Sequence, residues 1–146
     1  MAFVFTDIKN IKKTIKPWGY EKWIASGDGF AYVLKEIFFK ASFRSSLQFH
    51  KQKHETIFFQ SGKGIFHYSS ETIDIEKFEK EEYSESHLQK IINNLQKREL
   101  TPGTIIHIKP GCIHRIESIE NLKIIEASTI QLDDVVRLSD DSGREN

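Results

Sequence analysis

Residues 48–55 read Gln-Phe-His-Lys-Gln-Lys-His-Glu, and a glycine follows at position 62. Side chains alternate between the two faces of a strand, so Gln48, His50 and Gln52 are expected to share one face. A polar row that lines the inside of a barrel needs partners, because a buried polar group without a hydrogen bond is costly. A metal ion is one such partner. Imidazole and carboxylate ligands suit zinc, manganese, iron, nickel or cobalt.

A second motif runs from Gly103 through Gly111 to His114. Gly111 permits a sharp turn, and His114 is expected to begin the next strand. Together with His50 and Glu55, His114 forms a set of two histidines and one carboxylate, which leaves coordination positions open for substrate or water. The alternative is a metal-free barrel in which these side chains form an internal hydrogen-bond network.

The rest of the chain predicts short strands separated by turns, a pattern typical of a sandwich or barrel. Strands are expected at residues 30–40, 45–52, 56–60, 65–68, 72–78, 104–108, 113–117 and 122–130, with 56–60 and 65–68 paired as a hairpin across Gly62 and Gly64. Leu88, Ile91, Ile92 and Leu95 recur at helical spacing, and Ser86 with Gln89 resembles a capping box. These features predict a short helix at 86–97, inside a charged insertion at 76–99.

Length and composition predict one domain over residues 1–146. The 21 basic and 21 acidic residues cancel, so the overall charge does not favour a nucleic-acid or membrane partner. No apolar run approaches the ~20 residues that span a bilayer. The single cysteine, Cys112, excludes an intramolecular disulfide. The expected location is the cytoplasm.

The two motifs and their spacing resemble the cupin superfamily. Glu55 and Gly62, with six residues between them, match the end of its first motif, and Gly103, Gly111 and His114 match its second. The resemblance implies an all-β fold, a jelly-roll barrel of two antiparallel sheets.

Segments at both ends of the chain resemble the type II mannose-6-phosphate isomerases, which often form the C-terminal cupin domain of bifunctional enzymes with mannose-1-phosphate guanylyltransferase. The matching segments are Lys16-Pro17-Trp18-Gly19, Ser46-Leu47-Gln48-Phe49-His50, His114-Arg115, Asp133–Leu138 and Asp141–Arg144. The resemblance therefore covers residues 16–144. It implies an ordered C-terminal segment, whereas composition alone predicts a frayed tail from Gln131.

The sequence departs from this family at one expected metal ligand. The second histidine of the family's His-x-His pair is replaced by Gln52, whose amide oxygen is a weaker ligand than imidazole. The resemblance implies a metal site of His50, Gln52, Glu55 and His114. Gln48 or His54 could take the place of Gln52.

The implied reaction is aldose–ketose isomerisation of a sugar phosphate such as mannose 6-phosphate, through an enediol. The metal would stabilise charge on the sugar oxygens, and a base would move the proton between adjacent carbons. Lys35 and Glu126 are the candidates for that proton transfer. Phosphate suits bidentate arginine contacts, for which the candidates are Arg44, Arg115, Arg137 and Arg144.

Two other classes remain open, because a fold does not determine a function. One is a different cupin enzyme, such as a sugar-nucleotide ketoisomerase or epimerase, or a metal-dependent dioxygenase. The other is a non-catalytic module that binds a sugar phosphate, which the replacement by Gln52 would suit. By analogy with cupins we expect a homodimer that covers exposed sheet edges, with Ala2–Ile8 as an exchanged strand.

Overall fold

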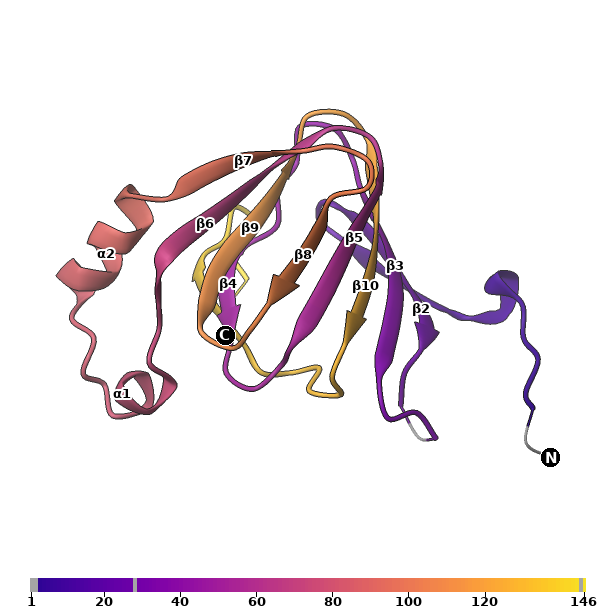
Figure 1. The fold of residues 1–146 in the computed structure, drawn as a ribbon, viewed down its shortest axis with the longest axis horizontal. Helices are drawn as coiled ribbons and strands as arrows, with labels where there is room; N and C mark the ends of the chain where they lie inside the picture. Colours follow the sequence, from indigo (N-terminus) through magenta and orange to yellow (C-terminus); the bar gives the residue numbers. More distant parts are fainter. Residues whose placement is uncertain (1–2, 28, 145) are drawn as a thin grey trace.

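Two packed antiparallel sheets form the body of the protein (Figure 1). The structure is a computed structural model that describes residues 3–27, 29–144 and 146. The six-stranded sheet has the order β1 (Lys12–Lys16), β2 (Gly19–Ala25), β3 (Val33–Phe39), β10 (Leu122–Ser128), β5 (Glu55–Ser61) and β8 (Ile105–Ile108). The five-stranded sheet has the order β11 (Val135–Ser139), β4 (Leu47–His50), β9 (Cys112–Ser118), β6 (Gly64–Thr72) and β7 (Gln96–Leu100).

The neighbouring strands β3 and β10 change from apolar to polar along their inward faces. On β3, Phe39 and Ile37 point inward, followed by Lys35. On the neighbouring β10, Ile124 lies opposite Ile37, and Glu126 lies opposite Lys35. The apolar halves pack into one core, where the rings of Trp18 and Phe39 stack with centroids 4.0 Å apart. The polar halves surround the cavity described below.

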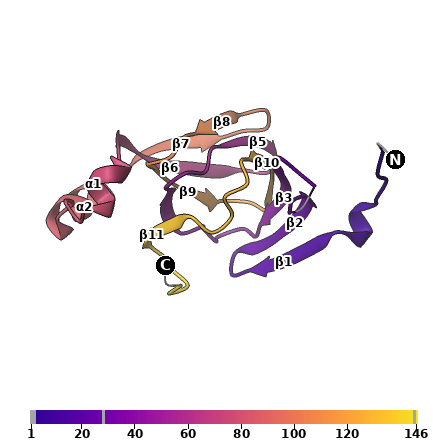
Figure 2. The ribbon, with the colours of Figure 1, turned by 90° about the horizontal axis from the view of Figure 1, so that it is seen from below.

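A second apolar cluster covers the outer face of the five-stranded sheet. Leu47 and Phe49 point away from the cavity, and helices α1 (Ile75–Glu79) and α2 (Glu85–Asn93) pack over them through residues that include Phe78 and Ile91. The rings of Phe49 and Phe78 meet edge to face at 5.0 Å. Figure 2 shows both helices outside the barrel, on the side remote from β1.

The structure corrects the predicted secondary structure of the charged insertion. The helix begins at Glu85, because the N-cap is Ser84, whose side chain accepts a hydrogen bond from the amide of His87. It ends at Asn93, and residues 96–100 form β7 instead of continuing it. The strand predicted at 72–78 is also wrong, because Asp74 caps α1 directly after β6 ends.

Three further differences concern the strands, and one expectation is confirmed. The predicted hairpin does not form, because β5 and β6 belong to different sheets and the chain crosses between them at Gly62. Strands β1 and β2 were not predicted. The C-terminal segment is ordered, as the family resemblance implies and composition alone does not, since β11 pairs with β4. The stretch predicted as an exchanged strand contains no strand from Phe3 onward and ends in a short 3₁₀ helix at Ile8–Asn10; Ala2 lies outside the described residues.

None of the helices in the described ranges is long and apolar enough to cross a membrane.

Candidate functional site

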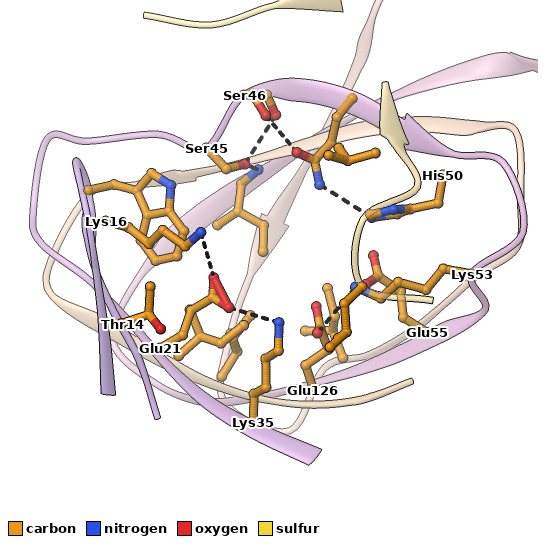
Figure 3. A pocket seen from close by; sticks show the side chains of 18 of the residues that line it. Thr14, Lys16, Glu21, Lys35, Ser45, Ser46, His50, Lys53, Glu55 and Glu126 are labelled. Atoms are coloured by element: carbon orange, nitrogen blue, oxygen red, sulfur yellow. Dashed lines mark hydrogen bonds and ion pairs between the residues drawn. The ribbon is translucent and has the colours of Figure 1, made fainter. Parts of the chain in front are cut away.

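A cavity of about 470 Å³ opens into the polar half of the barrel. Its walls come from β1, β2, β3, β4, β5, β9, β10 and the C-terminal segment. Figure 3 shows its charged and polar side chains pointing toward a common space. Seven of them are buried although they are ionisable: Glu21, Lys35, His50, Lys53, Glu55, His114 and Glu126.

Both predicted histidines line the cavity. Gln48 on β4 pairs with His114 on β9, and His50 follows two residues later on the same inward face. His114 Nδ1 donates to the Cys112 carbonyl at 2.9 Å, and His50 Nδ1 donates to the Asp134 carboxylate at 2.9 Å. These acceptors place the ring proton on Nδ1, so each neutral imidazole keeps a lone pair on Nε2.

Asp134 determines where β4 ends. Besides binding His50, its carboxylate accepts hydrogen bonds from the backbone amides of Gln52 at 2.7 Å and Lys53 at 2.8 Å. Although burial raises the pKa of Asp134, these amides and His50 hold it below its ordinary value. The resulting bend breaks the strand alternation, so Gln52 is exposed and Lys53 is buried against the cavity.

Because of this bend, only one of the three candidates for the fourth metal ligand lines the cavity. Gln52 and His54 are exposed and do not line the cavity, whereas Gln48 does. The Gln48 amide accepts from the Ser46 hydroxyl at 2.6 Å and places its nitrogen 3.5 Å from His50 Nε2. The structure therefore places Gln48, not Gln52, beside the histidines.

Lys53, which the sequence did not single out, lies between two carboxylates. Its ammonium is 2.9 Å from Glu55 Oε2 and 3.5 Å from Glu126 Oε2. Burial disfavours both carboxylate anions, but the hydrogen bond with His114 and the Lys53 ammonium hold the pKa of Glu55 well below its ordinary value. Burial and the neighbouring Glu55 charge instead raise the pKa of Glu126 to about 7. Glu55 is therefore an anion at neutral pH, whereas Glu126 can exchange a proton.

A second cluster of charged side chains lies across the cavity from Lys53 and its two carboxylates. Lys35 donates to Glu21 at 2.8 Å, and Lys16 lies 3.7 Å from the same carboxylate (Figure 3). Lys35 also lies opposite Glu126 in the β3–β10 register. The sequence patterns did not single out Glu21. The available signal was its position two residues after Gly19, which ends the Lys-Pro-Trp-Gly segment, and on the same strand face.

The four predicted arginines separate into two pairs. Arg137 and Arg144 line the cavity, and Arg144 forms a bidentate pair with Asp140 at 2.8 and 3.1 Å. Arg44 and Arg115 do not line it. Arg44 binds Asp141 at 2.9 Å through Nη2, and Arg115 donates to the Ser45 carbonyl at 3.0 Å.

The donor types fit a transition metal, although the donors do not surround a common point. His114 Nε2 and Glu55 Oε1 are 3.3 Å apart. At this distance Nε2 donates a hydrogen bond to Glu55 when it carries a proton, whereas a neutral ring with its proton on Nδ1 leaves two acceptors that a shared cation would bridge. The other Glu55 oxygen, near Lys53, has no well-directed hydrogen bond among the described residues. Within residues 3–27, 29–144 and 146, no three His, Cys, Asp or Glu side chains are gathered closely enough to hold a metal ion.

Comparison with solved structures identifies the fold. No protein-family model and no curated protein matches the sequence. The capsular polysaccharide assembling protein CapF from Staphylococcus aureus superimposes with a TM-score of 0.65 at 13% identity, over 94% of this chain and 33% of its own. Oxalate decarboxylase from Bacillus subtilis gives a TM-score of 0.66 at 11% identity, over 91% of this chain and 31% of its own.

The chain thus spans about a third of the length of either neighbour. Peruvianin-I, a cysteine peptidase from Thevetia peruviana latex, shares the fold with a TM-score of 0.63 at 13% identity, over 94% of this chain and 78% of its own. These matches confirm the predicted cupin jelly roll. At these identities they carry the fold alone.

Proposed function

We propose that this protein is a metal-dependent cupin enzyme that interconverts an aldose and a ketose carrying phosphate, such as mannose 6-phosphate. The observation that carries the proposal is Glu126. It is a buried carboxyl group in the cavity, with a pKa raised to about 7, beside a histidine–carboxylate cluster. Proton transfer between adjacent sugar carbons needs a group that both accepts and donates near neutral pH.

The side chains around Glu126 suit this role. Lys53 and Lys35 supply positive charge beside it, which favours the carboxylate form that takes the proton from carbon. Lys35 is held by Glu21, so its ammonium is fixed beside the reacting region. An ammonium in this place also stabilises negative charge on the sugar oxygens of the enediol.

His50, His114 and Glu55 are the residues that would hold the metal, with Gln48 as the fourth lining group. Oxalate decarboxylase from Bacillus subtilis, which has the same fold, contains Mn(II) centers. A bound divalent ion would act as a Lewis acid toward the sugar oxygens. Asp134 and the Cys112 carbonyl hold the two imidazoles in the tautomer that ligation requires.

The test combines an isomerase assay with elemental analysis of untagged protein. Conversion of mannose 6-phosphate to fructose 6-phosphate is expected, and Glu126→Gln should lower kcat by about 10²–10⁴-fold. The matched control is Glu36→Gln, on the adjacent strand but outside the cavity lining, which should leave kcat unchanged. An active Glu126→Gln variant would refute the assignment.

One observation supports a second candidate, a sugar-phosphate-binding module without turnover. Lys53 already neutralises Glu55, so the cavity has a cation without any metal. Protein that stays empty after incubation with zinc, manganese, iron, nickel and cobalt, and that binds hexose phosphates without converting them, would favour this candidate over the enzyme.

We also propose a homodimer built through the N-terminal segment. Phe3, Val4 and Phe5 are 71%, 89% and 88% exposed, and the segment extends away from the sheets (Figure 1). Three such apolar side chains in a row favour burial against a partner. Removal of residues 1–7 should convert the dimer to a monomer in sedimentation velocity, and a full-length monomer would refute the proposal.

A further inference from the structure

Strand β1 has an inverted pattern of polar and apolar residues. Lys12, Thr14 and Lys16 line the cavity, whereas Ile15 points to solvent and is 72% exposed. A strand at the edge of a sheet ordinarily directs its apolar side chains inward. Here the two lysines take the inward positions, so β1 contributes charge to the cavity instead of apolar surface.

Positive charge exceeds negative charge around the cavity. Among the described residues, six lysine and arginine side chains and four carboxylates line it, although the whole protein has a net charge of zero. The deep charges neutralise one another, because Lys35 pairs with Glu21 and Lys53 pairs with Glu55. The excess positive charge therefore lies at the more exposed rim of the cavity.

The lysines of β1 are oriented without being strongly neutralised. Lys16 lies 3.7 Å from Glu21, which Lys35 already binds at 2.8 Å, and the Lys16 side chain is 27% exposed. Lys12 lies over the ring of Trp23, 4.2 Å from its centroid. A cation–π contact of this kind positions an ammonium but leaves its charge available to an anion.

The C-terminal segment also contributes arginines to the rim. Arg137 and Arg144 of the C-terminal segment line the same cavity. Asp140 pairs with Arg144, and one exposed carboxylate, Asp133, lies on this side. The Nε1–H of Trp23, next to Lys12, has no hydrogen-bond acceptor among the described residues. On the β1 side, the rim therefore offers the Lys12 ammonium and the Trp23 Nε1–H to an anion.

We propose that Lys12 and Lys16 form an anion subsite at the rim of the cavity and bind the phosphate group of the ligand. The inference rests on the cavity of the proposed function and deepens it, since it assigns the phosphomonoester end of the substrate to β1 and the reacting carbons to the floor. Lysine ammonium groups bind phosphate as point charges and suit a group that rotates about an ester bond. A neutral sugar lacks the negative charge that would attract them.

Isothermal titration calorimetry on metal-stripped protein tests the subsite without any catalytic step. The probes are mannose 6-phosphate, inorganic phosphate and mannose. Lys16→Met and Lys12→Met should each weaken mannose 6-phosphate binding by about tenfold, as expected for loss of a hydrogen bond to a charged group. Raising the salt concentration should weaken the binding of mannose 6-phosphate to the wild type, because salt screens exposed charges.

Lys13→Met is the matched control. Lys13 lies between the two lysines on the same strand and loses the same charge, but its ammonium packs over Tyr20 at 4.4 Å and does not line the cavity. Mannose 6-phosphate affinity should be unchanged in this variant. Circular dichroism melts of all three variants establish that each one is folded.

The results separate this inference from the proposed function. Weakened binding of mannose 6-phosphate in the Lys12 and Lys16 variants, but not in the Lys13 variant, supports the subsite even if the protein has no isomerase activity. Equal affinity in all four proteins, equal losses in all three variants, or wild-type protein that binds mannose as tightly as mannose 6-phosphate would overturn it. Absence of any phosphate binding by the wild type would overturn it as well.

Discussion

Replacing Glu126 with glutamine should change how the free energy of unfolding depends on pH. Glu126 is 7% exposed, and burial together with the Glu55 charge raises its pKa from 4.5 to about 7. Each unit of pKa difference between the folded and unfolded states is worth ~1.4 kcal/mol, so the full effect is about 3 kcal/mol. Glutamine has the same shape and does not titrate.

The sign follows from which state holds the proton. Between pH 4.5 and about 7 the folded protein keeps the Glu126 proton while the unfolded chain loses it. The stabilisation is therefore fully present below pH 4.5 and is lost as the pH rises through the folded-state pKa. Relative to Glu126→Gln, the wild type should lose about 3 kcal/mol across this window.

Urea unfolding at a series of pH values, followed by tryptophan fluorescence, measures the difference. Trp18 is buried in the core and Trp23 lines the cavity, so both report on the folded barrel. Subtracting the variant from the wild type removes the contributions of titrating groups that do not interact with Glu126. A difference that stays constant from pH 4.5 to 8, with equal m-values, would refute the raised pKa and the acid–base role built on it.

Three further outcomes are expected. Gln48→Ala should weaken zinc or manganese binding in calorimetry, whereas Gln52→Ala should leave it unchanged; the reverse result would return the ligand role to the exposed glutamine. Lys53→Met should lower the melting temperature of metal-free protein, because two buried carboxylates lose their cation at a cost of ~3–5 kcal/mol, and zinc should raise it more than in the wild type. Gly111→Ala should destabilise the fold far more than Gly103→Ala: both have positive φ, but a Cβ at Gly111 would meet a carbonyl oxygen at 2.3 Å and at Gly103 nothing within 4 Å. Equal melting temperatures for the two glycine variants would contradict this packing argument.

Much of the candidate site could be predicted because the relevant signals are local. Alternation along a strand placed His50 on an inward face, and the glycine-to-histidine spacing of the second motif placed His114 just after a turn. Glu126 and Lys35 were charged residues within apolar strands, so each was already exceptional in its surroundings. All four line the cavity.

The position of Gln48 beside His50, His114 and Glu55 could not be predicted in this way. Alternation alone treats Gln48 and Gln52 as equivalent, since both share a face with His50. The structure separates them because Asp134, which is 82 residues after Gln52 in the chain, binds its backbone amide and ends the strand at His50. Lys53 enters the cavity for the same reason.

The sequence by itself determined the class of fold and the chemical types of the residues in the barrel, because alternation, turn glycines and the residue spacing of the two motifs are properties of neighbouring positions. Only the tertiary structure decided which charges meet. Glu21 pairs with Lys35, Lys53 lies between two carboxylates, and Arg44 lies outside the cavity while Lys16 lines it. These outcomes depend on strand order and register between segments far apart in the chain, where small shifts exchange one side chain for another.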